Sequence, residues 1–136
     1  MFELVISREF IAQMVMHCRA CYPNEACGIL AGTGNRVTKV YLMTNVEPSP
    51  ASYFMEPEEQ FRVMKELRQD NLTMVAIFHS HPQSPAFPSA KDVSLAFYQD
   101  AIYVIVGLMN QQDPEIRAYT IVDGLVTDVL FSITAQ

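Results

Sequence analysis

The chain has 136 residues, of which 50% are hydrophobic and 18% are charged; this composition predicts a single folded domain over residues 1–136 and excludes a disordered chain. Nine Lys and Arg residues against fifteen Asp and Glu residues give a formal net charge of −6, which repels phosphate backbones and argues against a nucleic-acid partner. No basic segment with a long apolar stretch opens the sequence, and no apolar run approaches membrane-spanning length, so we expect a cytoplasmic protein with no membrane partner.

Hydrophobic periodicity, helix caps and turn residues divide the chain into strands and helices. In chain order they predict a strand over residues 2–6, a helix that Ser7 caps and Pro23 ends, strands over 26–32, 37–43 and 53–55, a helix from Pro57 to about Asn71, a strand over 73–78, a helix from Ser89 to about Gln99, and strands over 101–108, 115–122 and 125–131. This order predicts an α/β fold of the mixed α+β kind, with helices packed against a mixed β-sheet.

The strand predicted over residues 73–78 leads into the most unusual part of the chain. Its nearly continuous apolar run, TMVAIF, indicates a central strand covered on both faces. The stretch HSHPQSPAFPSAKD follows at residues 79–92 and contains two of the three histidines. In a strand, residues two apart point to the same face, so His79 and His81 are expected to project side by side.

Two imidazoles on one face can both bind one metal ion. Zinc prefers such nitrogen ligands and needs a third protein ligand, which leaves a fourth position for water in a catalytic site. Asp92 can supply that ligand, because three prolines in residues 82–88 restrict the loop that leads to it. The sequence therefore predicts one Zn²⁺ per chain, held by His79, His81 and Asp92, with another divalent ion as an alternative occupant.

These residues also have interpretations that need no metal. Ser89-x-x-Asp92 at a helix start is the pattern of a capping box, in which both side chains satisfy free backbone N–H groups. A lone histidine is more often structural than a ligand, and we interpret His17 on the first predicted helix in that way. Two histidines on one face, a stiff loop and an acid together favour the metal site.

The three cysteines form a weaker pattern. Cys18 and Cys21 make a C-x-x-C pair, but no second pair or matching histidine pair accompanies them. Both lie inside a helical pattern, so we expect them to pack in the core. Cys27 makes the number odd, which agrees with a reducing compartment and not with a disulfide scaffold.

A hydrolytic metal site also needs a general base, and Glu25 is the best candidate. It lies between a turn and an apolar strand in YPNEACGILAG, where partial burial would raise the pKa of its carboxyl toward the working range of a base. The alternative is a solvated turn residue.

With these residues the chain resembles the JAMM (MPN-plus) zinc metalloprotease family, in its compact bacterial form. The family pattern is a glutamate on an early strand, then His-Ser-His-Pro or His-Thr-His-Pro, and, seven residues after the second histidine, Ser-x-x-Asp. Glu25, HSHP at residues 79–82, Ser89 and Asp92 match this pattern at every position. The resemblance covers nearly the whole chain and implies the family fold, a cytidine-deaminase-like mixed sheet flanked by helices.

The resemblance also implies a role for each matched residue. His79, His81 and Asp92 would bind zinc. Glu25 would take the proton from the zinc-bound water and pass it to the leaving group. Ser89 would donate a hydrogen bond to the tetrahedral oxyanion, where a donor stabilises developing charge.

Members of this family hydrolyse amide or isopeptide bonds that follow the tail of a ubiquitin-like protein. The chain has no room for the insertions with which larger deubiquitinases grip two ubiquitin units. The resemblance therefore implies a ubiquitin-like partner, of the sulfur-carrier type, with a Gly-Gly C-terminus. Residues 53–55 are our candidate edge for pairing with that tail, with an ordinary edge strand as the alternative. Phe87 either lines the cleft or anchors its loop.

Two other functions compete with the zinc-peptidase prediction. Inactive MPN scaffold domains lack metal ligands, whereas this chain keeps all three together with Glu25. A DNA-repair-associated family carries a similar His-x-His-Pro motif, but the acidic balance and the absence of an N-terminal helical DNA-binding module argue against that role. The sequence predicts no particular oligomeric state.

Overall fold

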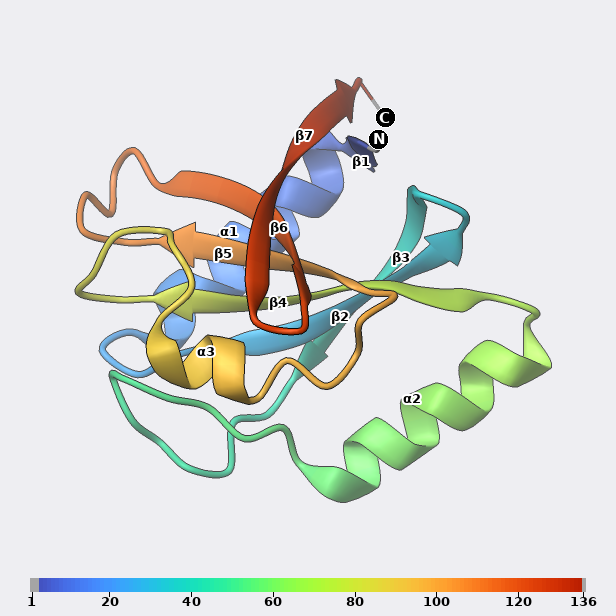
Figure 1. The fold of residues 1–136 in the computed structure, drawn as a ribbon, viewed down its shortest axis with the longest axis horizontal. Coiled ribbons are helices and arrows are strands. Elements are labelled where there is room, and N and C mark those ends of the chain that lie inside the picture. Colours follow the sequence, from blue (N-terminus) through green and yellow to red (C-terminus); the bar gives the residue numbers. More distant parts are fainter. Residues whose placement is uncertain (1–2, 136) are drawn as a thin grey trace.

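A computed structural model describes residues 3–135, so Phe2, expected at the start of the first strand, lies outside the described residues. The strands are β1 (Glu3–Ser7), β2 (Cys27–Thr33), β3 (Arg36–Met43), β4 (Thr73–His81), β5 (Ile102–Gly107), β6 (Glu115–Val122) and β7 (Leu125–Thr134). The helices are α1 (Arg8–Cys21), α2 (Pro57–Gln69) and α3 (Ala90–Ser94) (Figure 1).

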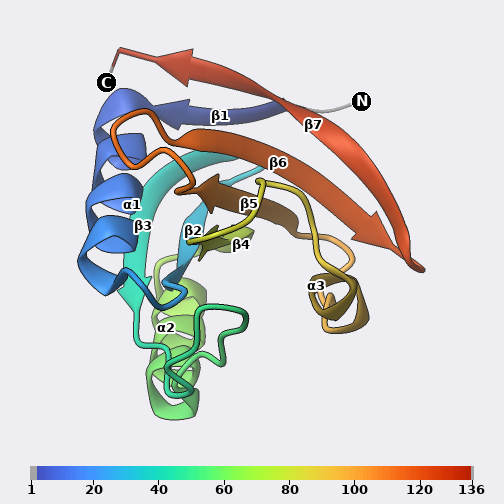
Figure 2. The same ribbon diagram turned by 90° about the vertical axis from the view of Figure 1, so that its left-hand side faces the viewer.

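The strands form one strongly curved mixed sheet that closes into a barrel in the order β1-β3-β2-β4-β5-β6-β7. β4 lies at its centre, antiparallel to β2 and parallel to β5. β1 closes the ring by pairing in parallel with β7 and, at Val5 and Arg36, with β3. Figure 2 shows α1 along one side of this sheet and α2 and α3 at other positions around it. The mixed α/β fold predicted from the sequence is confirmed.

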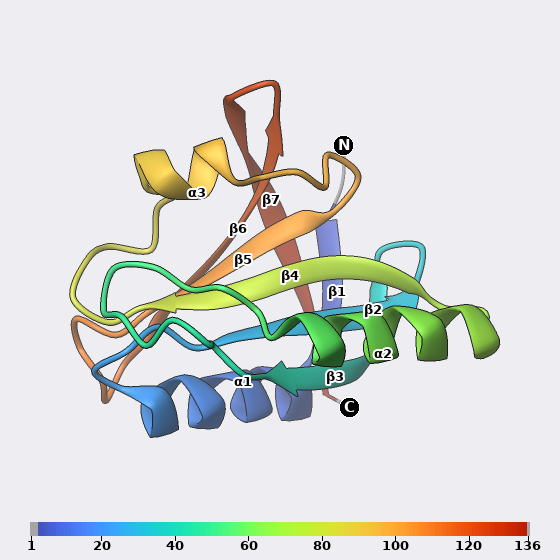
Figure 3. The same ribbon diagram turned by 90° about the horizontal axis from the view of Figure 1, so that it is seen from below.

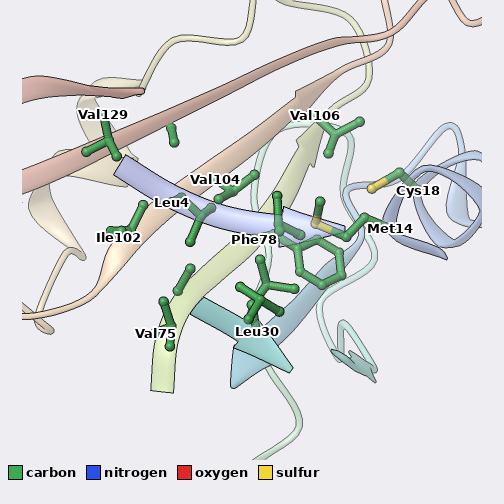
Figure 4. Packing of buried hydrophobic residues seen from close by; sticks show 14 of the residues in the cluster. Leu4, Met14, Cys18, Leu30, Val75, Phe78, Ile102, Val104, Val106 and Val129 are labelled. Atoms are coloured by element: carbon green, nitrogen blue, oxygen red, sulfur yellow. The ribbon is translucent and has the colours of Figure 1, made fainter. Parts of the chain in front are cut away.

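Two apolar clusters cover the two faces of the sheet. The first contains Leu4, Met14 and Phe78, which come from β1, α1 and β4 (Figure 4). The second contains Ile77 and Leu67, which join β4 to α2. Because the neighbours Ile77 and Phe78 belong to different clusters, β4 is buried on both faces, as its apolar run predicted.

Caps define the first two helices as the sequence predicted. The Ser7 hydroxyl accepts a hydrogen bond from the Phe10 amide at 3.2 Å, which satisfies a free N–H group at the start of α1. Pro57 stands at the first position of α2, where its missing N–H costs nothing. None of the described helices is long and apolar enough to cross a membrane.

Four predicted elements differ from the structure by three residues or more. β7 continues past residue 131 to Thr134, because β1 pairs with it to that residue. β4 continues past residue 78 to His81, because β5 pairs with it to its last residue. α3 ends at Ser94 instead of about Gln99, since it has no buried residue and a short helix needs a packed apolar face to continue. The strand predicted over residues 53–55 is wrong: only an isolated bridge between Asn45 and Met55 forms there.

Candidate metal centre

The carboxyl end of β4 holds both histidines of the motif. His79 pairs with Cys27 of β2 and with Ile105 of β5, and His81 pairs with Gly107 of β5. This pairing fixes the backbone on both sides and directs the two histidine side chains to one face. They are 2% and 3% exposed, respectively.

Asp92 reaches the same point from the first turn of α3. Its Oδ2 lies 3.2 Å from His79 Nε2 and 2.9 Å from His81 Nε2, and the two Nε2 atoms are 3.1 Å apart. Ligand atoms around a tetrahedral zinc ion lie about 3.3 Å from one another, given bond lengths of roughly 2.0 to 2.1 Å. These three side chains could therefore hold a metal ion after small movements. Within residues 3–135, no other three His, Cys, Asp or Glu side chains converge in this way.

His81 is oriented by the loop that follows it. Its Nδ1 lies 2.8 Å from the Pro85 carbonyl oxygen, which can only accept a hydrogen bond, so Nδ1 carries the hydrogen. The neutral ring then presents the Nε2 lone pair to a metal, an arrangement that is common around metal-binding histidines. Tyr119 holds the loop in turn, because its hydroxyl donates to the Ala86 carbonyl at 2.6 Å. The Phe87 ring packs edge-on against Tyr119 and so helps to anchor this loop.

His79 is held differently. Among the described residues, its buried Nδ1 has no hydrogen-bond partner. The ring of Tyr53 instead stacks on the His79 ring, with centroids 4.9 Å apart and an interplanar angle of 29°. Tyr53 belongs to the loop between β3 and α2, which runs beside the carboxyl end of β4 (Figure 3).

Ser89 and Asp92 form the capping box that was the alternative interpretation of their spacing. The Asp92 amide donates to Ser89 Oγ at 3.0 Å, and the Ser89 amide donates to Asp92 Oδ2 at 2.9 Å. The cap and the convergence with the histidines use the same carboxylate, so the two interpretations are compatible. The cap in fact fixes the carboxylate in the position that faces the histidines.

Asp92 and His81 shift each other's pKa values. Burial opposes ionisation of Asp92, but the hydrogen bonds from His79 and His81 outweigh it and hold the pKa of the Asp92 carboxyl below its usual range. Burial likewise opposes protonation of His81, but its hydrogen bonds to Asp92 and to the Pro85 carbonyl raise its pKa. Metal binding needs deprotonated ligands, so a metal ion would compete with protons for the histidine nitrogen atoms.

Glu25 enters the site from the residues just before β2. The register that pairs Cys27 with His79 continues to Ala26 and Ser80, since the Ser80 amide donates to the Ala26 carbonyl at 3.1 Å. One further step places Glu25 across from His81, on the same face. Glu25 is 4% exposed and its Oε1 has no hydrogen-bond partner among the described residues. This burial shows that the alternative of a solvated turn residue is wrong. Burial is also the largest cause that raises the pKa of the Glu25 carboxyl to about 8.

Ser80 has a role that the sequence did not reveal. Its side chain points away from the two histidines, as the alternation predicted, and its Oγ accepts the Ala26 amide at 2.8 Å. With the backbone bond between the same two residues, this doubles the link between β4 and the segment that carries Glu25. The serine between the histidines therefore positions the glutamate.

A largely apolar pocket, with five Phe and Tyr residues in its walls, opens beside His79 and Asp92. Its other lining residues are Ser52, Tyr53, Phe54, Met55, Gln60, Ile77, Lys91, Leu95, Phe97, Tyr98 and Tyr103. Phe54 and Phe97 are 53% and 75% exposed, which is unusual for large apolar side chains. Phe87 does not line this pocket, so of its two expected roles the structure supports the anchoring one.

The remaining histidine and the cysteines have structural positions. His17 Nε2 lies 3.2 Å and 3.1 Å from the backbone oxygens of Cys27 and Met43. Cys18 is fully buried in the first apolar cluster, and Cys21 packs against that cluster. All three cysteines are free thiols. The expectation that the C-x-x-C pair packs in the core agrees with these positions.

Comparison with known proteins identifies the family. Residues 7–122 match the family described as prokaryotic homologs of the JAB domain. The CysO-cysteine peptidase of Mycobacterium tuberculosis is 39% identical over 137 residues, which cover 99% of this chain and 94% of that protein. A probable TtuB-protein conjugate cleaving protease of Thermus thermophilus is 32% identical over 122 residues, covering 89% of this chain and 78% of that protein.

A solved structure agrees with these relatives. The solution structure of a protein from Desulfitobacterium hafniense has a TM-score of 0.88 and 34% identity, and covers 98% of this chain and 94% of that one. The family match covers β2 to β6 and every residue of the candidate site, and the similarity to the Mycobacterium peptidase covers nearly the whole chain. The chain belongs to the prokaryotic JAB-domain proteins of the JAMM family, as its motif predicted, and it is a hydrolase of the peptidase type.

Proposed function

We propose that this protein is a zinc-dependent peptidase that hydrolyses the amide bond after the C-terminal Gly-Gly tail of a ubiquitin-like sulfur-carrier protein. The observation that carries the proposal is the convergence of His79, His81 and Asp92 on one point beside a buried glutamate. Relatives named for cleaving CysO-cysteine and TtuB conjugates support the class of substrate.

In this proposal His79 and His81, through Nε2, and Asp92, through its carboxylate, hold the zinc ion. Two neutral imidazoles and one carboxylate suit zinc and leave it a net positive charge. When bound, zinc would polarise the scissile carbonyl and lower the pKa of the attacking water toward neutrality. The two buried Nε2 atoms and Asp92 Oδ2 all lie within 3.2 Å of one another, which supports a shared cation.

Glu25 is the proposed general base and then the general acid. Its carboxylate takes a proton from the attacking water as the oxygen–carbon bond forms, and passes that proton to the amine nitrogen as the carbon–nitrogen bond breaks. The products are a carboxyl group on the carrier tail and a free amine. Burial suits this task, because it raises the pKa of Glu25 to about 8, near the value at which a group can both accept and return a proton. The charge of a bound cation would lower that pKa.

Ser89 is the proposed donor to the tetrahedral oxyanion. Its Oγ accepts the Asp92 amide, which uses the oxygen as an acceptor and leaves the O–H group free to donate. A donor held by a helix cap changes its position little during the reaction, and such preorganised donors stabilise the transition state selectively.

The carrier tail is proposed to lie along residues 53–55. Although this segment is no regular strand, it is held from one side only: Val46 N donates to Phe54 O at 2.9 Å, and Glu56 N donates to Thr44 O at 3.0 Å. In this pattern the backbone groups of Tyr53 and Met55 point the opposite way. They form a free edge that an extended Gly-Gly tail could pair with, as in other strand-addition complexes.

The direct test is incubation with a ubiquitin-like sulfur carrier extended by one residue beyond its Gly-Gly end. Mass spectrometry should show loss of that residue and retention of the Gly-Gly end, and a chelator should stop the reaction. An intact substrate in the presence of a fully zinc-loaded enzyme would contradict the proposal. The same carrier ending in Ala-Ala is the matched control for the tail.

A further inference from the structure

We infer that Tyr53 is a positioning residue that couples occupation of the tail-binding edge to the metal ligand His79. The inference rests on the proposed function. It assigns to the Tyr53 side chain a link between metal binding and binding of the substrate tail. Substrate tail and metal ion would then bind cooperatively.

The two histidine rings are supported in different ways. His81 is oriented by a hydrogen bond from Nδ1 to a backbone carbonyl, the usual support for a metal-binding histidine. His79 lacks this bond, because its Nδ1 is buried and has no partner among the described residues. The ring of His81 lies against the His79 ring at a tilt of 59°, and the ring of Tyr53 stacks on the His79 ring at 29°, so Tyr53 is the contact from outside the ligand set that limits its rotation.

Tyr53 lies between the proposed tail-binding edge and His79. Its backbone lies on the edge proposed to bind the tail, and its side chain covers His79 in the wall of the same pocket. Pairing of an extended tail with this edge would hold the Tyr53 backbone from its open side. Holding the Tyr53 backbone fixes its Cα and Cβ, and with them the side-chain rotamers in which the ring can reach His79.

Hydrogen bonds connect the loop that carries Tyr53 to Glu25. Asn45 Oδ1 accepts the Phe54 amide at 2.9 Å, and Asn45 Nδ2 donates to the Glu25 carbonyl at 3.0 Å. The Glu25 amide in turn donates to the Ser49 carbonyl at 2.8 Å. The loop that carries Tyr53 is therefore connected to the proposed base as well as to a metal ligand, and its ordering acts on both.

The expected coupling follows from linkage. A tail that stabilises the stacked position of Tyr53 raises the affinity for zinc, and zinc raises the affinity for the tail by the same factor. Loss of a supporting contact around a metal ligand lowers metal affinity by about 10- to 100-fold. The stack is one contact on one ligand, so we expect a value near the lower end.

The experiment measures zinc affinity by competition with a chelator, with and without a short peptide that ends in Gly-Gly. For the wild-type protein, the peptide should raise zinc affinity by about fivefold, the lower end of typical coupling between sites. Tyr53→Leu should lower zinc affinity by about tenfold and abolish the effect of the peptide. Tyr53→Phe keeps the ring and should stay within about twofold of the wild type on both measures.

Two further measurements separate positioning from general damage. The visible spectrum of the cobalt-substituted protein should change in Tyr53→Leu and not in Tyr53→Phe, because it reports the geometry of the ligands. Phe61→Leu, an equivalent change at an aromatic residue that is 70% exposed on α2, should leave zinc affinity, spectrum and coupling as in the wild type.

The inference is overturned if Tyr53→Leu has wild-type zinc affinity and an unchanged cobalt spectrum. It is also overturned, without any variant, if saturating peptide leaves the zinc affinity of the wild type unchanged, which covers the case in which Tyr53→Leu does not fold. A wild-type protein that binds zinc and cleaves the extended carrier, yet shows neither effect, would remove this inference and leave the proposed function intact. A wild-type protein that binds no zinc would instead remove the proposed function.

Discussion

The two halves of the candidate site are built in different ways. The first half, His79 to His81 with Glu25, is held by strand pairing: β4 is bonded to β2 on one side and to β5 on the other. The second half, residues 44–56 and 82–99, has little regular structure. It is fixed by single hydrogen bonds such as Tyr119 to Ala86 and Ser89 to Asp92.

The two halves contribute different groups: the sheet half carries two proposed metal ligands and the proposed base, and the loop half adds Asp92, Ser89 and the walls of the open pocket. His79, His81 and Glu25 lie on or next to the rigid sheet, which suits a metal-binding or catalytic constellation, and the capping box of α3 holds Asp92 and Ser89 in place from the loop half. The groups that line the open pocket lie on loops that can adjust to a partner. We therefore expect changes at His79, His81, Asp92 or Glu25 to abolish metal binding or turnover, and changes at the other residues of the loop half to reduce them by smaller factors.

His81→Ala should have the largest effect. It removes one of the three proposed ligands and leaves Asp92 without one of its two histidine partners. Zinc content should fall from about one per chain to near zero, and hydrolysis of the extended carrier should fall to background. Elemental analysis of the purified protein measures the first, and mass spectrometry measures the second. Gln83→Ala, an exposed change in the same loop, is the control and should keep both.

Glu25→Gln should retain zinc and lose turnover. The amide has nearly the same shape as the carboxyl group but cannot accept the proton, and positioned acid–base groups contribute about 10²- to 10⁴-fold. Elemental analysis and turnover with the extended carrier, run on the same preparation, give both values. Wild-type turnover in this variant would remove Glu25 as the base while leaving the metal site unchanged.

Ser89→Ala tests the loop half, where one side chain both caps α3 and is the proposed oxyanion donor. Turnover should fall by about 10²-fold, as for other single oxyanion donors, and the free energy of unfolding should fall by about 1 kcal/mol through loss of the cap. Ser89→Gly separates the two roles, because glycine is almost as good a cap. A Gly variant as active as the wild type would show that the hydroxyl acts only as a cap.

The metal-free protein should become less stable as the pH rises from about 5 to 8. Glu25 has a pKa of about 8 in the folded chain, against an ordinary value of 4.5, so the folded state binds its proton more tightly than the unfolded state does. That stabilisation is complete below the unfolded value and is lost as the pH approaches the folded one. The raised pKa of His81 acts in the same direction, whereas the lowered pKa of Asp92 affects stability only in acid.

Denaturant unfolding in the presence of a chelator measures this dependence, and we expect a loss of about 2 kcal/mol between pH 5 and pH 7. Glu25→Gln should remove most of the slope. A metal-free protein whose stability is flat across this range would contradict the burial of an uncompensated carboxyl group. Zinc should reverse the trend, because metal binding requires deprotonated ligands.

The sequence predicted the sheet half of the site better than the loop half, and the reason is physical. Period-two alternation and an apolar run are local signals, and they were sufficient to place His79 and His81 on one face of a central strand. The end of that strand was predicted too early, because its last residues are polar and their burial depends on pairing with β5. The helix after Ser89 was predicted too long, since its apolar residues Leu95 and Phe97 remain exposed.

The supporting contacts had no local signal at all. Tyr119 holds the loop after β4 from a strand 33 residues away in the sequence. Asn45 reaches Glu25 across 20 residues. Tyr53 was singled out only as part of a strand edge, and its stacking on His79 depends on the course of an irregular loop. Such contacts arise from the closed fold, which a single sequence read by pattern does not specify.

The most direct test of the account is X-ray absorption at the zinc edge of the protein loaded with one equivalent of zinc, combined with a crystal structure of that complex. We expect one ion bound by His79 Nε2, His81 Nε2 and the Asp92 carboxylate, at distances of about 2.0 to 2.2 Å. Zinc bound by the cysteines of α1, or no zinc held at β4 while the protein still cleaves its substrate, would contradict it.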